Sequence, residues 1–263
     1  YDVLLNQPLI NEEVAISLIE NVIGQGSLPV GLLPRIIVDD KEYVVPMMVE
    51  EPSVVAAASY GAKLVNQSGG FKTVSSERLM IGQIVFDEVN DTEQLALNIE
   101  QLESNIHKIA DAAYPSIKAR GGGYRRIEID TFPEQHLLSL KIYVDTKDAM
   151  GANMLNTILE VITAHLKIEF PHYNVLMSIL SNHATASVVK VQGEIDVKDL
   201  NRGERSGEEV AYRMERASVL AQIDIHRAAT HNKGVMNGIH SVVLATGNDL
   251  SLIHISDGAR EAC

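Results

Sequence analysis

The chain has 263 residues, 46% of them hydrophobic and 22% charged, and its formal net charge is −13. These values are typical of a globular protein with one large or two medium domains, and no apolar run reaches the roughly 18 residues of a membrane-spanning helix. The acidic balance argues against a nucleic acid or an anionic membrane as partner, but it leaves room for a phosphorylated ligand. The only cysteine, Cys263, leaves no disulfide framework, so we expect a cytoplasmic protein.

The first expected elements are a helix and a β-hairpin. Asn11 can cap a helix over residues 11–23, with acidic residues in its first turn. Apolar runs at 35–38 and 43–49 flank the polar residues 39–41, which is the pattern of a hairpin.

The chain is organised around a stretch in which an apolar run ends in Glu50, Glu51 and Pro52 and a small-residue helix follows. Proline costs no hydrogen bond in a first turn, and acids there favour the helix dipole, so we expect these three residues at the helix entry. The helix should run to about Leu64 and end before the glycines at 69–70. Two interpretations stay open: a pair of solvated N-terminal acids, or functional carboxylates beside a tightly packed helix.

From about residue 78 the pattern predicts a compact unit. Its order, β-α-β-β-α-β, is that of a ferredoxin-like domain. We therefore expect an α+β protein in which a small domain at 78–182 is inserted into a larger one, formed by 1–77 and 183–249. The segments that carry this prediction are strands at 79–89, 125–132, 137–144 and a buried one at 175–180, with helices at 92–113 and 153–166.

The region after the small domain alternates apolar and polar segments. The expected elements are a strand at 187–197, a polar loop at 201–207, a helix at 208–228, a loop at 230–234, and a helix or strand at 235–244. Both ends of the chain look cut, because it starts without a methionine and residues 250–256 (LSLIHIS) resemble the translation of a transposon end used in sequencing libraries. We expect residues 250–263 to be a foreign tail.

Two groups of residues could carry chemistry. Gly151 lies at a strand–helix junction, where backbone can approach a pyrophosphate, although a lone glycine there is more often a simple turn; no Gly-x-Gly-x-x-Gly supports a Rossmann domain. The second group contains Lys233 and Asp249, together with Arg227, Asn237 and Asn248. A lysine held by a carboxylate keeps its charge and can stabilise an oxyanion; the alternative is two exposed loop charges. No spacing indicates a metal site.

Several motifs in the right order resemble one family. These are residues 20–24 (ENVIG), 45–46 with 50–59 (VP and EEPSVVAAAS), 148–153 (DAMGAN), 227–234 (RAATHNKG) and 245–249 (ATGND). They resemble 3-hydroxy-3-methylglutaryl-CoA (HMG-CoA) reductase, in the wording of its class II enzymes, over residues 11–249. The resemblance implies a large substrate domain with an inserted ferredoxin-like cofactor domain, and a homodimer whose active sites lie at the subunit interface.

The resemblance also implies a reaction and roles. HMG-CoA is reduced to mevalonate and CoA by two hydrides from NADPH or NADH, in the mevalonate pathway to isoprenoids. Glu51 matches the proton donor, whose pKa must be raised, Lys233 the cation on the carbonyl oxygen, and Asp249 the carboxylate that links them. Substrate-binding positions match Ser53, Arg227 and Asn237, and cofactor-binding positions match Asp148, Met150, Gly151, Asn153 and Asn182.

Two departures from the family pattern matter. NAD-preferring class II enzymes carry an acid before the Gly-Gly-Gly turn; the aligned position is Tyr114, with Lys118 and Arg120 nearby, which favours NADPH. The family also uses a histidine on a C-terminal flap beyond Asp249, which this sequence does not contain. We therefore expect this chain to be inactive or weak as it stands, and the alternative is a non-catalytic CoA- or nucleotide-binding remnant.

Overall fold

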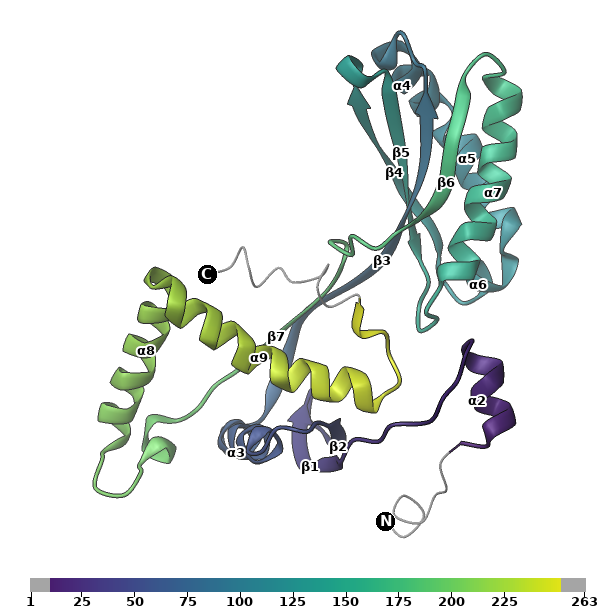
Figure 1. Cartoon of the computed structure of the whole chain (residues 1–263). Coiled ribbons are helices and arrows are strands. Elements are labelled where there is room, and N and C mark those ends of the chain that lie inside the picture. Colours follow the sequence, from purple (N-terminus) through teal and green to yellow (C-terminus); the bar gives the residue numbers. More distant parts are fainter. Residues whose placement is uncertain (1–9, 252–263) are drawn as a thin grey trace.

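The computed structural model describes residues 10–251 of the chain. Within these residues, two α-helices and two strands precede a long central strand, and the remaining helices and strands follow it (Figure 1). The helices are α2 (Glu12–Leu18), α3 (Val54–Gln67), α4 (Thr92–Gln101), α5 (Glu103–Ala113), α6 (Pro115–Ala119), α7 (Ala152–Glu169), α8 (Gly207–Ile223) and α9 (Ile225–Ala245), with 3-10 turns at Pro133–Gln135 and Val197–Leu200. The strands are β1 (Val30–Val38), β2 (Lys41–Met48), β3 (Phe71–Asp87), β4 (Gly123–Phe132), β5 (Leu137–Asp145), β6 (Asn174–Ser181) and β7 (Ser187–Gly193).

The 17-residue strand β3 connects the two parts of the molecule that Figure 1 shows, one above the other. Its first half pairs with β7 in antiparallel register and touches β1 through Val38 and Phe71. Its second half pairs with β5 on one side and β6 on the other. Strand β3 is therefore hydrogen-bonded to other strands in both the lower and the upper part.

The upper part confirms the expected α+β fold with β-α-β-β-α-β order. Its strands lie in the order β6-β3-β5-β4 with every pair antiparallel, which is the split βαβ arrangement. Helices α5 and α7 cover one face of this sheet (Figure 1). Nineteen buried residues form one core there, including Ile84, Phe86, Ile142 and Leu159, so this half has a packed interior of its own.

The lower part is built around the β1–β2 hairpin. Helix α3 packs on β1 and helix α9 packs on β2, and the two helices also touch. The buried residues at their junction are Leu33, Met47 and Ala62, with Val242 of α9 packed against them. The small residues of α3 permit this close approach, as the Ala-rich sequence indicates.

Several predicted boundaries are wrong. Helix α2 ends at Leu18 rather than 23, although Asn11 caps it as expected by accepting from the Glu13 N–H at 3.0 Å. The predicted helix at 92–113 is interrupted at Leu102, which separates α4 from α5. Strand β6 has no buried residue, contrary to the prediction, because it lies at the edge of the sheet with β3 as its only neighbour among the described strands.

The largest corrections concern the C-terminal helices. The helix expected at 208–228 ends at Ile223, and α9 then runs straight through the loop expected at 230–234. Asp224 causes this break, because its carboxylate accepts from the N–H groups of His226 and Arg227 and so starts a new helix. Among residues 10–251, no helix is long and apolar enough to cross a membrane. Residues 252–263, most of the expected foreign tail, lie outside the described residues.

Candidate functional site

Glu51 lies in the turn between β2 and α3, not in the first helical turn as predicted. Helix α3 starts at Val54, and Ser53 before it has φ +73°, a left-handed conformation that costs a non-glycine residue about 1–2 kcal/mol. The Ser53 carbonyl accepts from the Ala57 N–H at 2.8 Å and so closes the first turn. This turn holds Glu51 outside the helix, where its side chain can reach α9.

Helix α9 supplies the partners of Glu51. Lys233 and Asn237 are four residues apart and therefore lie on one helical face. The Lys233 ammonium donates to Glu51 Oε2, and the Asn237 Nδ2 donates to the same oxygen at 3.3 Å. The packing of α9 on β2 and α3 brings these segments together, although 182 residues separate Glu51 from Lys233 in sequence.

The Glu51–Lys233 pair is half open to water, with exposed side-chain fractions of 43% and 58%. The hydrogen bond from Lys233 lowers the pKa of Glu51, and this exceeds the small opposing effect of burial. The expectation of a raised pKa is therefore not met in the single chain. In this arrangement the Glu51 carboxylate accepts from an ammonium and an amide. These two donors are suitable for holding an oxygen of a polar ligand.

Among residues 10–251, Asp249 and Arg227, which were also expected at this site, form no hydrogen bond or ion pair with Glu51 or Lys233. The Asp249 carboxylate accepts from the Ser251 N–H at 2.8 Å, and the Ser251 side chain together with this N–H lowers the pKa of Asp249. Arg227 is exposed in the first turn of α9, where its backbone N–H is bonded to Asp224. The predicted link between Glu51 and Lys233 through Asp249 is therefore absent from this conformation, and the pair is direct.

The expected cofactor loop connects β5 to α7. Gly151 has φ +92°, and a Cβ there would lie 2.5 Å from the Thr146 side chain and 2.7 Å from Met80 Sδ, so only glycine fits. The Ala149 carbonyl accepts from Arg78 at 3.0 Å and from the Thr146 hydroxyl at 3.2 Å. The loop is consequently well fixed. Asp148, Met150 and Asn153 lie in it or directly after it, and Asn182 follows β6 in an exposed turn.

Beside this loop lies a polar pocket of about 550 Å³ that the sequence analysis missed. It is lined on β3 by residues 76–79, on β4 by Arg125 and Arg126, and at the loop by Asp145, Lys147 and Asp148. The four basic side chains, including Arg78, suit an anionic ligand, while the acids balance part of their charge. The Arg-Arg pair at 125–126, one residue after the Gly-Gly-Gly turn, was the signal that could have found it.

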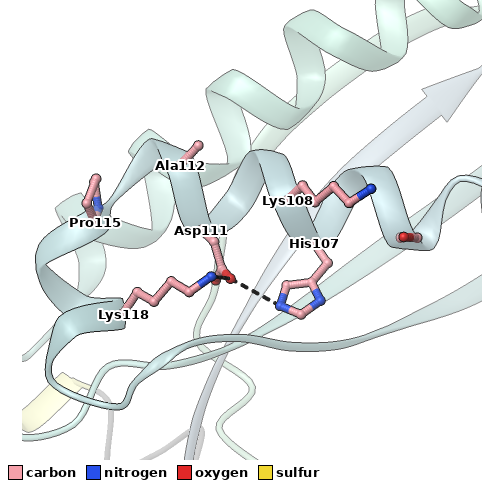
Figure 2. Close-up of a pocket in the computed structure, with 7 residues that line it drawn as sticks. His107, Lys108, Asp111, Ala112, Pro115 and Lys118 are labelled. Atoms are coloured by element: carbon pink, nitrogen blue, oxygen red, sulfur yellow. Dashed lines mark hydrogen bonds and ion pairs between the residues drawn. The ribbon is translucent and has the colours of Figure 1, made fainter.

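A second pocket lies on α5 and α6, near the predicted cofactor-selecting position Tyr114. Figure 2 shows Asp111 pointing between Lys118 and His107. The distances from its Oδ2 are 2.5 Å to Lys118 Nζ and 3.2 Å to His107 Nε2, and the Asp111 side chain is 10% exposed. Lys118 is thus already neutralised by a carboxylate, which weakens its expected contribution to binding a 2′-phosphate. Among the described residues, no group of His, Cys, Asp or Glu side chains could hold a metal ion.

The chain is similar in sequence to known proteins of one family. Residues 3–260 match the family model described as hydroxymethylglutaryl-coenzyme A reductase. The chain is 38% identical to 3-hydroxy-3-methylglutaryl-coenzyme A reductase of Archaeoglobus fulgidus, over 92% of this chain and 54% of the relative. It is 34% identical to a probable enzyme of the same name from Borreliella burgdorferi, over 94% of this chain and 56% of the relative. The chain therefore spans about half the length of these curated relatives.

Solved structures give the same match. The reductase from Streptococcus pneumoniae superposes with a TM-score of 0.89 at 42% identity, over 99% of this chain and 62% of that one. A second structure, the class II enzyme from the same organism bound to NADPH in open conformations, also gives a TM-score of 0.89 at 42% identity, over 99% of this chain and 71% of that one.

Proposed function

The chain belongs to the hydroxymethylglutaryl-coenzyme A reductase family, and we propose that it is the catalytic part of a class II enzyme. The proposed reaction converts HMG-CoA to mevalonate and CoA with two hydrides from a nicotinamide cofactor, in the mevalonate pathway. The relatives named above are reductases, which favours this reaction over the alternative of a non-catalytic CoA- or nucleotide-binding remnant.

The observation that carries the proposal is the direct contact between Glu51 and Lys233. In the proposed mechanism, Lys233 stabilises the negative charge that grows on the substrate carbonyl oxygen, and Glu51 donates the proton to it. Asn237 donates to the same carboxylate oxygen and keeps the group oriented. Binding of CoA alone does not require an acid in contact with a cation, whereas the fold brings Glu51 and Lys233 together from positions 182 residues apart.

The remaining sequence-predicted residues have proposed roles as substrate and carboxylate contacts. Arg227 and Ser53 would bind the hydroxymethylglutaryl group, because a guanidinium suits a carboxylate and both side chains are exposed beside the ends of α9 and α3. Asp249 would reach the Glu51–Lys233 pair only after a movement of the segment that follows α9, since its present partner is Ser251.

The low pKa of Glu51 is compatible with this role if the site is covered. We propose a homodimer with the active site at the interface, in which a second subunit would exclude water from a pair that is half exposed in the single chain. Removing water raises the pKa of a carboxyl group, which is the direction that a proton donor needs. Proximity to a bound substrate would act in the same direction by desolvation.

For the cofactor, we propose NADPH, with NADH as the weaker alternative. The start of α7 and the loop before it contain Asp148, Met150, Gly151 and Asn153. The free N–H groups at this helix end can donate to a phosphate. The basic side chains of the neighbouring pocket favour the more negative cofactor. A similar structure, the S. pneumoniae class II enzyme, is described as bound to NADPH.

The proposed domain boundaries follow the sequence analysis, with a substrate domain of 1–77 and 183–249, a cofactor domain of 78–182 and a foreign tail at 250–263. The buried core of the upper part supports the proposed cofactor domain, since all members of this core fall between residues 84 and 166. The acidic composition and the absence of a disulfide framework support a cytoplasmic enzyme.

The test is the substitution Glu51→Gln in the protein encoded by the whole gene. Glutamine keeps the shape and the contacts to Lys233 but cannot donate the proton, so HMG-CoA binding should survive while NADPH oxidation disappears. Binding is measured by calorimetry and oxidation by the loss of NADPH absorbance. Unchanged turnover would remove Glu51 as the proton donor, and loss of binding alone would make it a substrate contact.

A further inference from the structure

We propose that Arg125 and Asp145 are positioning residues, which fix the loop 145–151 in the conformation that receives the nicotinamide cofactor without themselves binding it. This inference rests on the proposed function, because it assigns a role to the loop that we propose to bind the cofactor.

A β-bulge aims the Arg125 side chain. In the β4–β5 ladder, Tyr124 pairs with Val144 and Arg126 pairs with Tyr143, so Arg125 is an extra residue without a partner in β5. Such a bulge breaks the alternation of side chains and redirects the extra one. Arg125 consequently turns back over the Gly-Gly-Gly turn that precedes β4.

The guanidinium of Arg125 is almost fully used inside the protein. Its NH1 group donates to the carbonyl oxygens of Gly122 and Tyr124, at 3.3 and 3.2 Å. Its NH2 group donates to the Gly121 carbonyl at 2.8 Å and to Asp145 Oδ2 at 2.7 Å. A guanidinium has five N–H donors, so these four bonds leave only Nε for a ligand. Arg125 is therefore placed to hold protein backbone rather than a phosphate.

Asp145 transmits this constraint to the loop. Its carboxylate accepts from Arg125 and also from the backbone N–H of Lys147 at 2.9 Å, while Lys147 Nζ lies 3.0 Å away. Burial alone would raise the pKa of Asp145, but the hydrogen bonds from Lys147 and Arg125 outweigh it and lower that pKa, so the carboxylate stays charged at neutral pH.

The turn and the loop also touch directly. A Cβ at Gly122 would lie 2.5 Å from the Asp145 carbonyl oxygen, so the Gly-Gly-Gly turn packs on the end of β5 with no room for a side chain. The other end of the loop is fixed by Gly151, and its middle by the bond from Arg78 to Ala149. Arg125 and Asp145 thus anchor the first residues of a loop whose middle and end are also held by contacts.

The experiment measures NADPH binding to the full 263-residue chain by fluorescence titration, with HMG-CoA binding as a second measurement. The variants are Arg125→Lys, Asp145→Asn and the double variant. Because a misplaced binding loop can cost up to roughly a hundredfold, we expect each single variant to weaken NADPH binding about tenfold or more and to leave HMG-CoA binding unchanged. The double variant should be no weaker than the worse single one, because both residues act through one link.

Lysine separates positioning from simple charge attraction. It keeps the positive charge but cannot hold three carbonyl oxygens and a carboxylate, so Arg125→Lys should not retain the NADPH affinity. The matched control is Arg213→Lys: Arg213 lies on α8, outside this pocket, and its Nε donates to Glu209 at 3.0 Å, so the same substitution there should change binding less than twofold. Hydrogen exchange of the amides at 146–151 should accelerate in the Arg125 and Asp145 variants and not in the control.

The outcomes are distinct. The positioning role is overturned if Arg125→Lys or Asp145→Asn binds NADPH with wild-type affinity. It is also overturned if the variants lose NADPH and HMG-CoA binding equally. Either result leaves the proposed function intact. If the unsubstituted chain does not bind NADPH at all, the proposed function fails, and the positioning role fails with it.

Discussion

The loop after β5 and the Glu51–Lys233 pair are held in place in different ways. The loop is fixed by contacts of Arg78 and Asp145 with its backbone and by Arg125, which binds the Asp145 carboxylate, and it lies above a core of buried side chains. The pair joins two distant segments by one ion pair and one amide contact, and both charged side chains are half exposed.

This difference indicates which part of the molecule can form its site without a second surface. The upper part encloses its own core and its loop within one stretch of chain, so its geometry follows from local sequence. The lower part presents its charged pair to water, and several apolar side chains of β2, α3 and α9 are exposed as well, including Val44, Tyr60, Val235 and Ile239. We infer that the lower site reaches its working state only when another surface covers it.

The largest expected effect is on catalysis. Lys233→Met removes the cation that opposes the growing charge on the substrate oxygen, so turnover should fall roughly a thousandfold, the effect of losing one strong oxyanion donor. Steady-state NADPH oxidation with HMG-CoA measures it. The control is Lys167→Met, an exposed lysine in the last turn of α7, which should leave turnover unchanged. Normal turnover in Lys233→Met would contradict the proposed mechanism.

The second effect contrasts the stability of the two parts. Ile142→Ala removes a fully buried side chain from the upper core and should lower the free energy of unfolding by about 2–5 kcal/mol. Val189→Ala, on the exposed strand β7 of the lower part, should change it by less than about 0.5 kcal/mol. Urea unfolding followed by circular dichroism compares them. Similar losses from both variants would show that the two parts are equally packed, contrary to the comparison above.

The third effect concerns Gly151. An alanine there must adopt φ +92° and displace Thr146 and Met80, so we expect a loss of about 1–3 kcal/mol in stability together with weaker NADPH binding. The matched control is Gly61→Ala, inside α3 with nothing within 4 Å of the added Cβ. Alanine is the better helix former, so this variant should gain about 0.5–1 kcal/mol. Tolerance of Gly151→Ala would mean that the loop is not fixed as described.

The smallest effect is on proton binding. The hydrogen bond from Lys233 lowers the pKa of Glu51, so the carboxyl of the single chain should titrate below the ordinary value of 4.5, and Lys233→Met should raise its midpoint. The sign follows from linkage: a lowered pKa in the folded state gives stabilisation that is present above the unfolded pKa and lost as pH falls through the folded one. Carbon-detected NMR of the Glu51 carboxyl measures both midpoints. An unchanged midpoint in the variant would show that the ion pair does not form in solution.

Much of the upper fold was predictable from sequence, because its strands are alternating or continuous apolar runs and its helices have a period near 3.6. The bulge at Arg125 was not, since one extra residue leaves the alternation of Ile127 and Ile129 after it intact. The exposed edge strand β6 was also misjudged, because an apolar run such as residues 175–180 looks alike in a central and an edge strand.

In the lower part, the sequence indicated Glu51 and Lys233 as functional residues through the family resemblance, and composition alone left both open. It placed Lys233 in a loop, because Gly234 and the polar residues before it disfavour a helix. The structure keeps them helical, since packing of α9 on β2 outweighs that local preference. The break at Asp224 was missed because residues on both sides of it favour a helix.

The most direct test of the account is the stoichiometry of the reaction catalysed by the protein encoded by the whole gene. With HMG-CoA as the limiting substrate, released CoA is measured with a thiol reagent and oxidised NADPH by its absorbance. The account predicts two NADPH oxidised for each CoA released, because a thioester is reduced to an alcohol in two hydride transfers. No HMG-CoA-dependent oxidation, or a ratio of one, would contradict it.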